Sequence, residues 1–173
     1  MGSLDGRIAL ITGSSRGIGE YLAKHLAKAG AKVAIAARTI EVTDKRLPGT
    51  IYSVAESINS EGGTATPVVM NMRDPESITN GVSQAAEELG GLDIVINNAA
   101  ILVPGNLETV QDRHLDLIWQ IDLRGPLLLM KYALPHLKNA GRGDIINVSS
   151  VAGVFPGSGP YDSTPQRREG SFY

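Results

Sequence analysis

The sequence contains no cysteine and no long apolar segment, and its charges nearly cancel. The absence of cysteine excludes disulfides, catalytic thiols and zinc–thiolate sites, and it fits a reducing compartment. The apolar runs are far shorter than the roughly 20 residues of a membrane-spanning helix, and the N-terminus lacks the features of a signal peptide. A net charge of −2 does not indicate nucleic acid or an anionic membrane as a partner. We therefore expect a soluble cytoplasmic protein with no nucleic-acid and no membrane partner.

The 173 residues suit one domain with a core of its own. Short apolar runs alternate with segments of helical periodicity, which predicts a doubly wound parallel sheet in a three-layer α/β/α arrangement. The expected strands are residues 7–12, 32–37, 64–70, 92–97 and 144–149. The expected helices are residues 17–29, 50–60, 74–89 and a long segment over 108–137. In the first helix we expect one buried face, made of Ile18, Leu22, Leu26 and Ala29.

A glycine-rich segment, residues 12–19, lies between the first expected strand and the first expected helix and contains Gly13, Gly17 and Gly19. This order predicts an anion site, because the N–H groups of a helix's first turn have no intrahelical partner. Glycines also let the phosphates of a dinucleotide approach the backbone. The spacing G-x-x-x-G-x-G departs from the fingerprint G-x-G-x-x-G, and an ordinary tight turn is the alternative.

Ligands of doubly wound sheets bind in the crevice at the carboxyl ends of the strands. Gly13, Ala37, Asn71 and Asn97 each fall at or just beyond the end of an expected strand. We therefore expect these four segments of the chain to converge on one crevice.

Two further motifs follow expected strands: Asn97-Asn98-Ala99-Ala100, and the segment 147–153 that contains Ser149 and Ser150. With residues 12–19, they resemble the short-chain dehydrogenase/reductase family, whose members carry T-G-x-x-x-G-x-G, N-N-A-G and a catalytic serine in this order. Ala100 replaces the last glycine of the second motif. The resemblance implies a Rossmann-like domain over residues 1–164 that binds a nicotinamide dinucleotide. It also implies hydride transfer with a small-molecule carbonyl or secondary alcohol.

The residue that ends the second strand selects the adenosine ribose, and an acidic side chain there would hold the 2′-hydroxyl. This sequence has no carboxylate there; Arg38 follows Ala37, and Arg16 adds a second guanidinium, a group that binds phosphate well. We therefore expect NADP(H) in preference to NAD(H), with a solvated loop residue as the alternative for Arg38. For Lys45 and Arg46 we expect a solvated loop. The resemblance implies that the following residues contact the cofactor: Gly13, Ser15, Arg16, Gly17, Ile18, Gly19, Arg38, Asn71, Met72, Asn98 and Ala99.

By resemblance, Ser150 matches the catalytic serine, with Ser149 as the alternative, and Tyr161 matches the catalytic tyrosine. In the family the tyrosine is the acid, and a lysine four residues later lowers its pKa, because a nearby cation favours the phenolate. Pro165 stands at the lysine position. We therefore expect residues 165–173 to be a polar tail outside the family sequence, and a nucleotide-binding module without catalysis is the alternative to an enzyme.

The fourth catalytic residue of the family is an asparagine, and Asp122 stands at its position. Because Pro126 has no N–H, the carbonyl of Asp122 lacks its helical donor and would be available to hold a water of a proton relay. A simple kink at Gly125 and Pro126 is the alternative. No carboxylate–histidine cluster has the spacing of metal ligands, so we expect no metal site.

The sheet is expected to be incomplete at its C-terminal edge, where Ile145, Ile146 and Val148 would form an apolar edge. We therefore expect poor solubility, a homo-oligomer or association through this edge. Trp119 and the leucines at 127–129 are interpreted as core or subunit-interface residues. The connection over residues 38–52 looks similar to that of the hydroxysteroid-dehydrogenase-like branch of the family.

Overall fold

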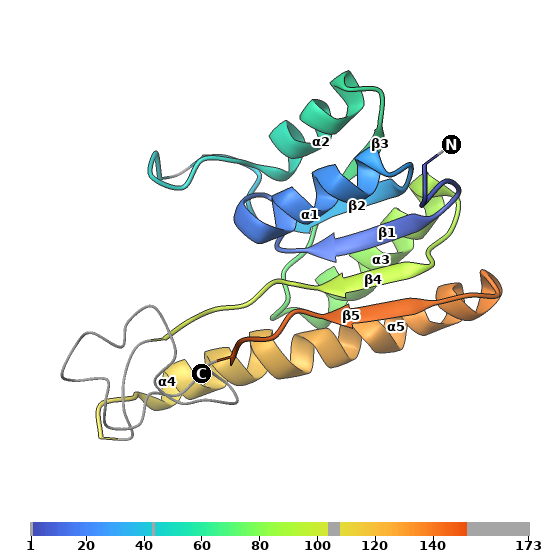
Figure 1. Ribbon diagram of the computed structural model, residues 1–173. Helices are drawn as coiled ribbons and strands as arrows, with labels where there is room; N and C mark the ends of the chain where they lie inside the picture. Colours follow the sequence, from blue (N-terminus) through green and yellow to red (C-terminus); the bar gives the residue numbers. More distant parts are fainter. Residues whose placement is uncertain (1, 43, 104–107, 152–173) are drawn as a thin grey trace.

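The computed structural model describes residues 2–42, 44–103 and 108–151 of the chain (Figure 1). Strands and helices alternate along it, as the sequence predicts. No helix in these ranges is both long and apolar enough to cross a membrane. The elements in chain order are β1 (Ile8–Thr12), α1 (Gly17–Lys28), β2 (Lys32–Ala37), α2 (Ile51–Ser60), β3 (Thr64–Val69), α3 (Pro75–Leu89), β4 (Ile94–Asn97), α4 (Asp112–Ile118), η1 (Trp119–Arg124), α5 (Gly125–Asn139) and β5 (Asp144–Asn147).

The five strands form one parallel sheet in the order β3-β2-β1-β4-β5. The chain runs outward from β1 to β3, and then returns to place β4 and β5 on the other side of β1. In this register Ala9 of β1 lies opposite Val33 of β2 and Ile94 of β4. The doubly wound fold is therefore confirmed, and four of the five predicted strands are one or two residues too long.

Helices α1 and α2 cover one face of the sheet, and α3 and α5 cover the other (Figure 1). The side chains of each central strand alternate between two cores. On β1, Ala9 and Ile11 pack toward α1 and α2, whereas Leu10 packs toward α3 and α5. Burial on both faces explains why the strands read as continuous apolar runs rather than as alternating patterns.

The predicted buried face of α1 is only partly confirmed, because Leu22 and Leu26 pack against the core but Ile18 does not. Ile18 is 65% exposed, and the line that faces the sheet consists of Gly19, Ala23 and Ala27. The reason is close approach, since a Cβ at Gly19 would lie 2.4 Å from the carbonyl oxygen of Gly13. Small residues therefore face the sheet, and Leu22 and Leu26 pack from the sides.

The long helix predicted over residues 108–137 begins at Asp112 and contains a π-helical segment, η1. There the N–H of Gly125 donates to the carbonyl of Gln120, five residues earlier. Pro126 explains this widening, because it has no N–H for the carbonyl of Asp122 and its ring would clash with that carbonyl in a regular α-helix.

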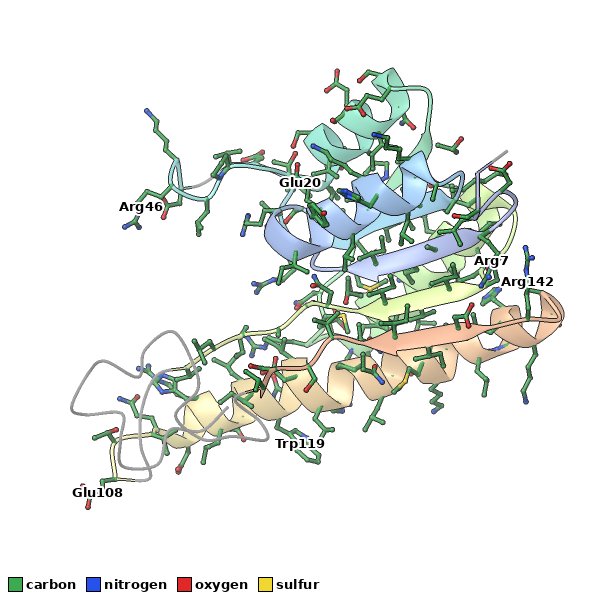
Figure 2. The ribbon with its side chains drawn as sticks, viewed as in Figure 1. Arg7, Glu20, Arg46, Glu108, Trp119 and Arg142 are labelled. Atoms are coloured by element: carbon green, nitrogen blue, oxygen red, sulfur yellow. The ribbon has the colours of Figure 1, made fainter. Side chains whose placement is uncertain are left out.

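The interpretation of Trp119 and the three leucines is only partly confirmed. Leu129 is fully buried between α5 and the sheet, whereas Trp119 and Leu127 are 58% and 53% exposed. Figure 2 shows Trp119 pointing away from the sheet. A subunit interface at this surface stays a prediction.

Strand β5 lies at the edge of the sheet, and its apolar side chains are exposed as predicted. Ile145, Ile146 and Val148 are between 40% and 47% exposed, and within the described ranges no strand pairs with the outer side of β5. Association through this edge stays a prediction.

An ion cluster joins three strands at their amino ends, opposite the ends where the crevice is expected. Arg7 binds both Asp93 and Asp144, and these carboxylates raise the pKa of its guanidinium. Asp93 is 3% exposed and also accepts a hydrogen bond from the N–H of Ile8 (3.0 Å). Arg142 lies beside this cluster and donates to the carbonyl of Gly6 (3.0 Å) (Figure 2). The cluster therefore holds the start of β1 against the starts of β4 and β5.

Replacing Asp93 by alanine should lower the free energy of unfolding by about 3 kcal/mol, because Arg7 would lose its buried partner. Urea unfolding followed by circular dichroism measures this difference. Asp44→Ala is the control, since Asp44 pairs with Arg46 on an exposed loop and its loss should leave stability unchanged. Equal effects of the two substitutions would contradict the role given to Asp93.

Candidate functional site

A cleft of about 250 Å³ opens at the carboxyl ends of the strands, between the turn after β1 and the segments that follow β2, β3 and β4. Gly13, Ala37 and Asn71 lie in its wall, as predicted. Asn97 does not, because its side chain is buried and donates to Asn147 Oδ1 (2.8 Å); the next residue, Asn98, lines the cleft instead. The cleft is lined by Thr12, Gly13, Ser15, Arg16, Ala36, Ala37, Arg38, Thr39, Met70, Asn71, Met72, Asn98, Ala99, Ala100, Ile101 and Ile121.

Hydrogen bonds between Thr12 and the segment after β4 fix the glycine turn in the cleft. The Thr12 hydroxyl accepts from the N–H groups of Asn98 and Ala99, both at 3.1 Å. The Asn98 amide in turn donates to the carbonyl of Thr12 (2.9 Å). Gly13 has a φ of 67°, and a Cβ there would lie 2.9 Å from the Cα of Ala99. Only glycine fits between these two segments.

Ser14 anchors the same turn to the neighbouring strand β2. Its buried hydroxyl donates to the carbonyl of Ile11 (2.7 Å) and accepts from the N–H of Ala36 (2.9 Å). Sequence reasoning missed Thr12 and Ser14 as positioning residues. The available signal was that both are polar and stand where a buried strand enters a glycine turn.

Helix α1 begins at the cleft without a side-chain cap. Arg16 is its N-cap residue, and the Arg16 side chain makes no capping hydrogen bond. Gly17 follows with a φ of 59° and open space at its Cβ position. The N–H groups of this first turn can therefore bind an anion. Gly17, Ile18 and Gly19 are not among the residues that line the cleft, and the contact of Gly19 is with the turn beneath it.

Two guanidinium groups lie in the cleft wall, and none of the described residues that line it is acidic. The Nη2 group of Arg16 donates to Thr39 Oγ1 (3.1 Å), while its Nε is buried and has no hydrogen-bond partner within the described part of the chain. Arg38 is exposed along the same wall. Because a buried N–H without an acceptor is unfavourable, an anionic acceptor fits beside Arg16.

Of the remaining predicted residues, some line the cleft and others are exposed to solvent. Asn71 and Met72 line the cleft, with Met72 buried. Arg46 pairs with Asp44 on an exposed loop that points away from the sheet (Figure 2), which confirms the solvated loop predicted for Arg46. Lys45 is exposed on the same loop.

Asp122 lies behind the cleft wall rather than in it. Its Oδ1 accepts from the N–H of Ile101 (3.0 Å), and Ile101 lines the cleft. Burial raises the pKa of Asp122, against the smaller effect of this hydrogen bond. Ser150 is exposed beyond β5, and Tyr161 lies outside the described residues. The roles of these three residues, and of the carbonyl of Asp122 in a relay, stay predictions.

A family model described as short chain dehydrogenase matches residues 7–164. The chain belongs to this family. The hydroxysteroid dehydrogenase-like protein 2 of Bos taurus is 42% identical over 156 residues, which are 90% of this chain and 37% of the relative; the Danio rerio protein of the same name is 43% identical with the same coverage. The chain thus spans just over a third of the length of these relatives.

Solved structures give the same assignment. A short chain dehydrogenase from Mycobacterium thermoresistibile is 38% identical with a TM-score of 0.80, over 85% of this chain and 52% of that one. A metagenomic short-chain oxidoreductase in complex with NADP is 32% identical with a TM-score of 0.78, over 89% of this chain and 66% of that one.

The substitution Asp122→Asn should raise the free energy of unfolding at neutral pH. An asparagine oxygen can still accept from the N–H of Ile101, and it carries no charge to bury. Since the pKa of Asp122 is raised in the folded state, the folded protein binds more protons than the unfolded chain between about pH 4 and the raised pKa. The buried carboxylate therefore lowers the free energy of unfolding by its full amount above the raised pKa, and this destabilisation disappears as the pH falls to about 4.

Urea unfolding of both proteins over this pH range measures the effect. We expect the advantage of Asp122→Asn to shrink as the pH falls. A variant that is less stable than the parent at neutral pH would contradict the prediction.

Proposed function

We propose that the protein is an NADP(H)-dependent oxidoreductase that transfers hydride between the nicotinamide and a small-molecule carbonyl or secondary alcohol. The observation that carries the cofactor preference is the pair Arg16 and Arg38 in a cleft wall whose described residues include no carboxylate. Guanidinium groups favour the 2′-phosphate of NADP(H), whereas an acidic residue would favour NAD(H). The NADP complex of the metagenomic oxidoreductase supports the same choice.

Three parts of the dinucleotide can be assigned to residues in and beside the cleft. The glycine turn and the first N–H groups of α1 would hold the pyrophosphate, because they combine open donors with the positive end of a helix dipole. Arg16 and Arg38 would hold the 2′-phosphate, and Asn71 and Met72 would border the adenine. The buried, unpartnered Nε of Arg16 supports this fit, since a phosphate oxygen would satisfy it.

The chemistry requires a hydride and a proton. When bound, the cofactor supplies or accepts the hydride. Ser150 would donate a hydrogen bond to the substrate oxygen, and Tyr161 would pass its hydroxyl proton to the developing alkoxide. The carbonyl of Asp122 would hold the water that returns this proton from solvent, because Pro126 cannot donate to it.

A second candidate is a nucleotide-binding module of the same family without hydride transfer. It is favoured by Pro165, which stands where the resemblance expects the lysine that lowers the pKa of Tyr161. The two candidates share the cleft and the cofactor and differ only in turnover.

Calorimetric titration with NADPH and NADH tests the cofactor assignment. NADPH should bind more tightly than NADH, and Arg16→Ala should weaken NADPH binding at least about tenfold while NADH binding changes little, because a charge-assisted contact to the 2′-phosphate is lost. Arg46→Ala is the matched control, since it removes the same charge from a residue that does not line the cleft and lies on a loop pointing away from the sheet. Equal losses for both cofactors after Arg16→Ala would contradict a 2′-phosphate contact.

Turnover of NADPH with a panel of ketones and aldehydes tests the catalytic assignment. Tyr161→Phe should reduce kcat by about 100-fold or more, because it removes the proton donor, and should leave the Kd of NADPH unchanged. Ser150→Ala should act in the same direction. If the protein binds NADPH tightly but shows no turnover that depends on Tyr161, the result would support the second candidate, the nucleotide-binding module.

A further inference from the structure

We propose that Gly49 is a positioning residue that holds Arg16 in place for the 2′-phosphate and so contributes to the selection of NADP(H). This inference rests on the proposed function. It assigns part of the cofactor preference to the β2–α2 connection (residues 38–50), through a residue that itself does not line the cleft.

The β2–α2 connection leaves the cleft and returns to it. Thr39 stands at its start and lines the cleft, and the N–H of Ile51 donates to the carbonyl of Thr39 (3.0 Å) where the connection ends. Its tip, marked by Arg46 in Figure 2, points away from the sheet. The two ends are therefore joined beside the glycine turn, and among the described residues of the connection Arg38 and Thr39 line the cleft.

Gly49 packs its backbone directly on the glycine turn. A Cβ at this position would lie 2.3 Å from the carbonyl oxygen of Ser15 and 3.6 Å from the Cβ of Arg16. Its φ of 106° also disfavours any residue with a side chain. Glycine is thus required here for contact as well as for conformation.

The position of Gly49 is fixed from the α2 side. Thr50 is the N-cap of α2, and its hydroxyl accepts from the N–H of Ser53 (3.0 Å) while the Ser53 hydroxyl accepts from the N–H of Thr50 (2.9 Å). This capping box holds the residue next to Gly49 in one conformation. The position of Gly49 is therefore supported by the N-terminus of α2.

Arg16 is held from two sides by this arrangement. Thr39 Oγ1 accepts from its Nη2 group (3.1 Å), and Gly49 lies beside the backbone from which the side chain starts, since a Cβ at position 49 would be 3.6 Å from the Cβ of Arg16. Its buried Nε stays without a partner within the described residues. A guanidinium that is already in place loses less freedom when it binds a phosphate, which increases affinity for ligands that carry that phosphate.

A side chain at position 49 would move the connection rather than the turn. Ser14 and Thr12 anchor the turn to β1, β2 and the segment after β4, whereas the connection contacts it from outside. Displacing the connection would draw Thr39 away from Arg16. Ligands with a 2′-phosphate would lose affinity, and ligands without it would be little affected.

The test compares Gly49→Ala with Gly62→Ala by calorimetric titration of NADP+ and NAD+. Gly62 also has a positive φ (85°), but nothing lies within 4 Å of its Cβ position, so it controls for backbone strain alone. We expect Gly49→Ala to weaken NADP+ binding at least about fivefold and NAD+ binding less than about twofold. Gly62→Ala should leave the ratio of the two affinities unchanged, and thermal unfolding shows whether each variant is folded.

A double-mutant cycle separates positioning from a general structural effect. In the Arg16→Ala background, Gly49→Ala should no longer change the affinity ratio, because the group that it positions is absent. If Gly49→Ala does not fold, Thr39→Val takes its place in the cycle, since it keeps the side-chain shape and removes the acceptor of Arg16.

The outcomes distinguish the two proposals. A wild-type protein without preference for NADP+ over NAD+ would overturn the proposed cofactor and this inference with it. A wild-type preference that neither Gly49→Ala nor, if needed, Thr39→Val reduces would overturn this inference alone, as would a reduction that persists in the Arg16→Ala background.

Discussion

The site depends on a contact between two backbones, the glycine turn after β1 and the segment after β4. No further side chain fits between them, because a Cβ at Gly13 would lie 2.9 Å from the Cα of Ala99 and a Cβ at Gly19 would lie 2.7 Å from the side-chain nitrogen of Asn98. The amide of Asn98 fills the remaining space and donates to both Thr12 and Gly13. This contact places the start of α1 at the carboxyl edge of the sheet, next to β1. Strands β2 and β3 lie on one side of β1, and β4 and β5 lie on the other. The cleft forms at that point, in agreement with the rule that ligands of doubly wound sheets bind at the switch point.

Much of the fold could be predicted because burial on both faces leaves a strong pattern, an apolar run that ends in polar or glycine residues. The failures have local causes. On α1, two rows of residues have helical spacing: Ile18 and Leu22 form one row, and Ala23 and Ala27 form the other. The distance between the helix and the sheet decides which row is buried. The π-helical turn could not be read from Pro126 alone. It also reflects the packing of Gly125, whose Cβ position is 2.6 Å from the carbonyl of Met72 on another segment.

Within the candidate site, the residues found from the sequence belong to the motif or follow a predicted strand, such as Gly13, Arg16, Arg38 and Asn98, and all four line the cleft. Those that were missed act on other residues. Ser14 meets Ala36 22 positions away, and Gly49 contacts Ser15 only because the β2–α2 connection returns to its starting point. A motif records spacing along the chain, whereas such contacts depend on the register of neighbouring strands and on the path of a loop. For this reason ligand-binding groups can be predicted from a motif, while the groups that position them require the folded structure.

The ion cluster and the cleft lie at opposite ends of the same strands, and the register of the sheet connects them. Arg7 and Asp93 fix the starts of β1 and β4, and the bonds between Thr12 and Asn98 fix their ends. Because side chains alternate along a strand, a slip of one residue would turn each core residue of β1 to the wrong face and carry Thr12 away from Asn98. None of the cluster residues is among the described residues of the cleft wall, so the cluster supports the site through the register of the sheet. Arg16, Arg38 and Gly49 take no part in these bonds, so we expect substitutions there to leave the register, and with it the sheet, intact.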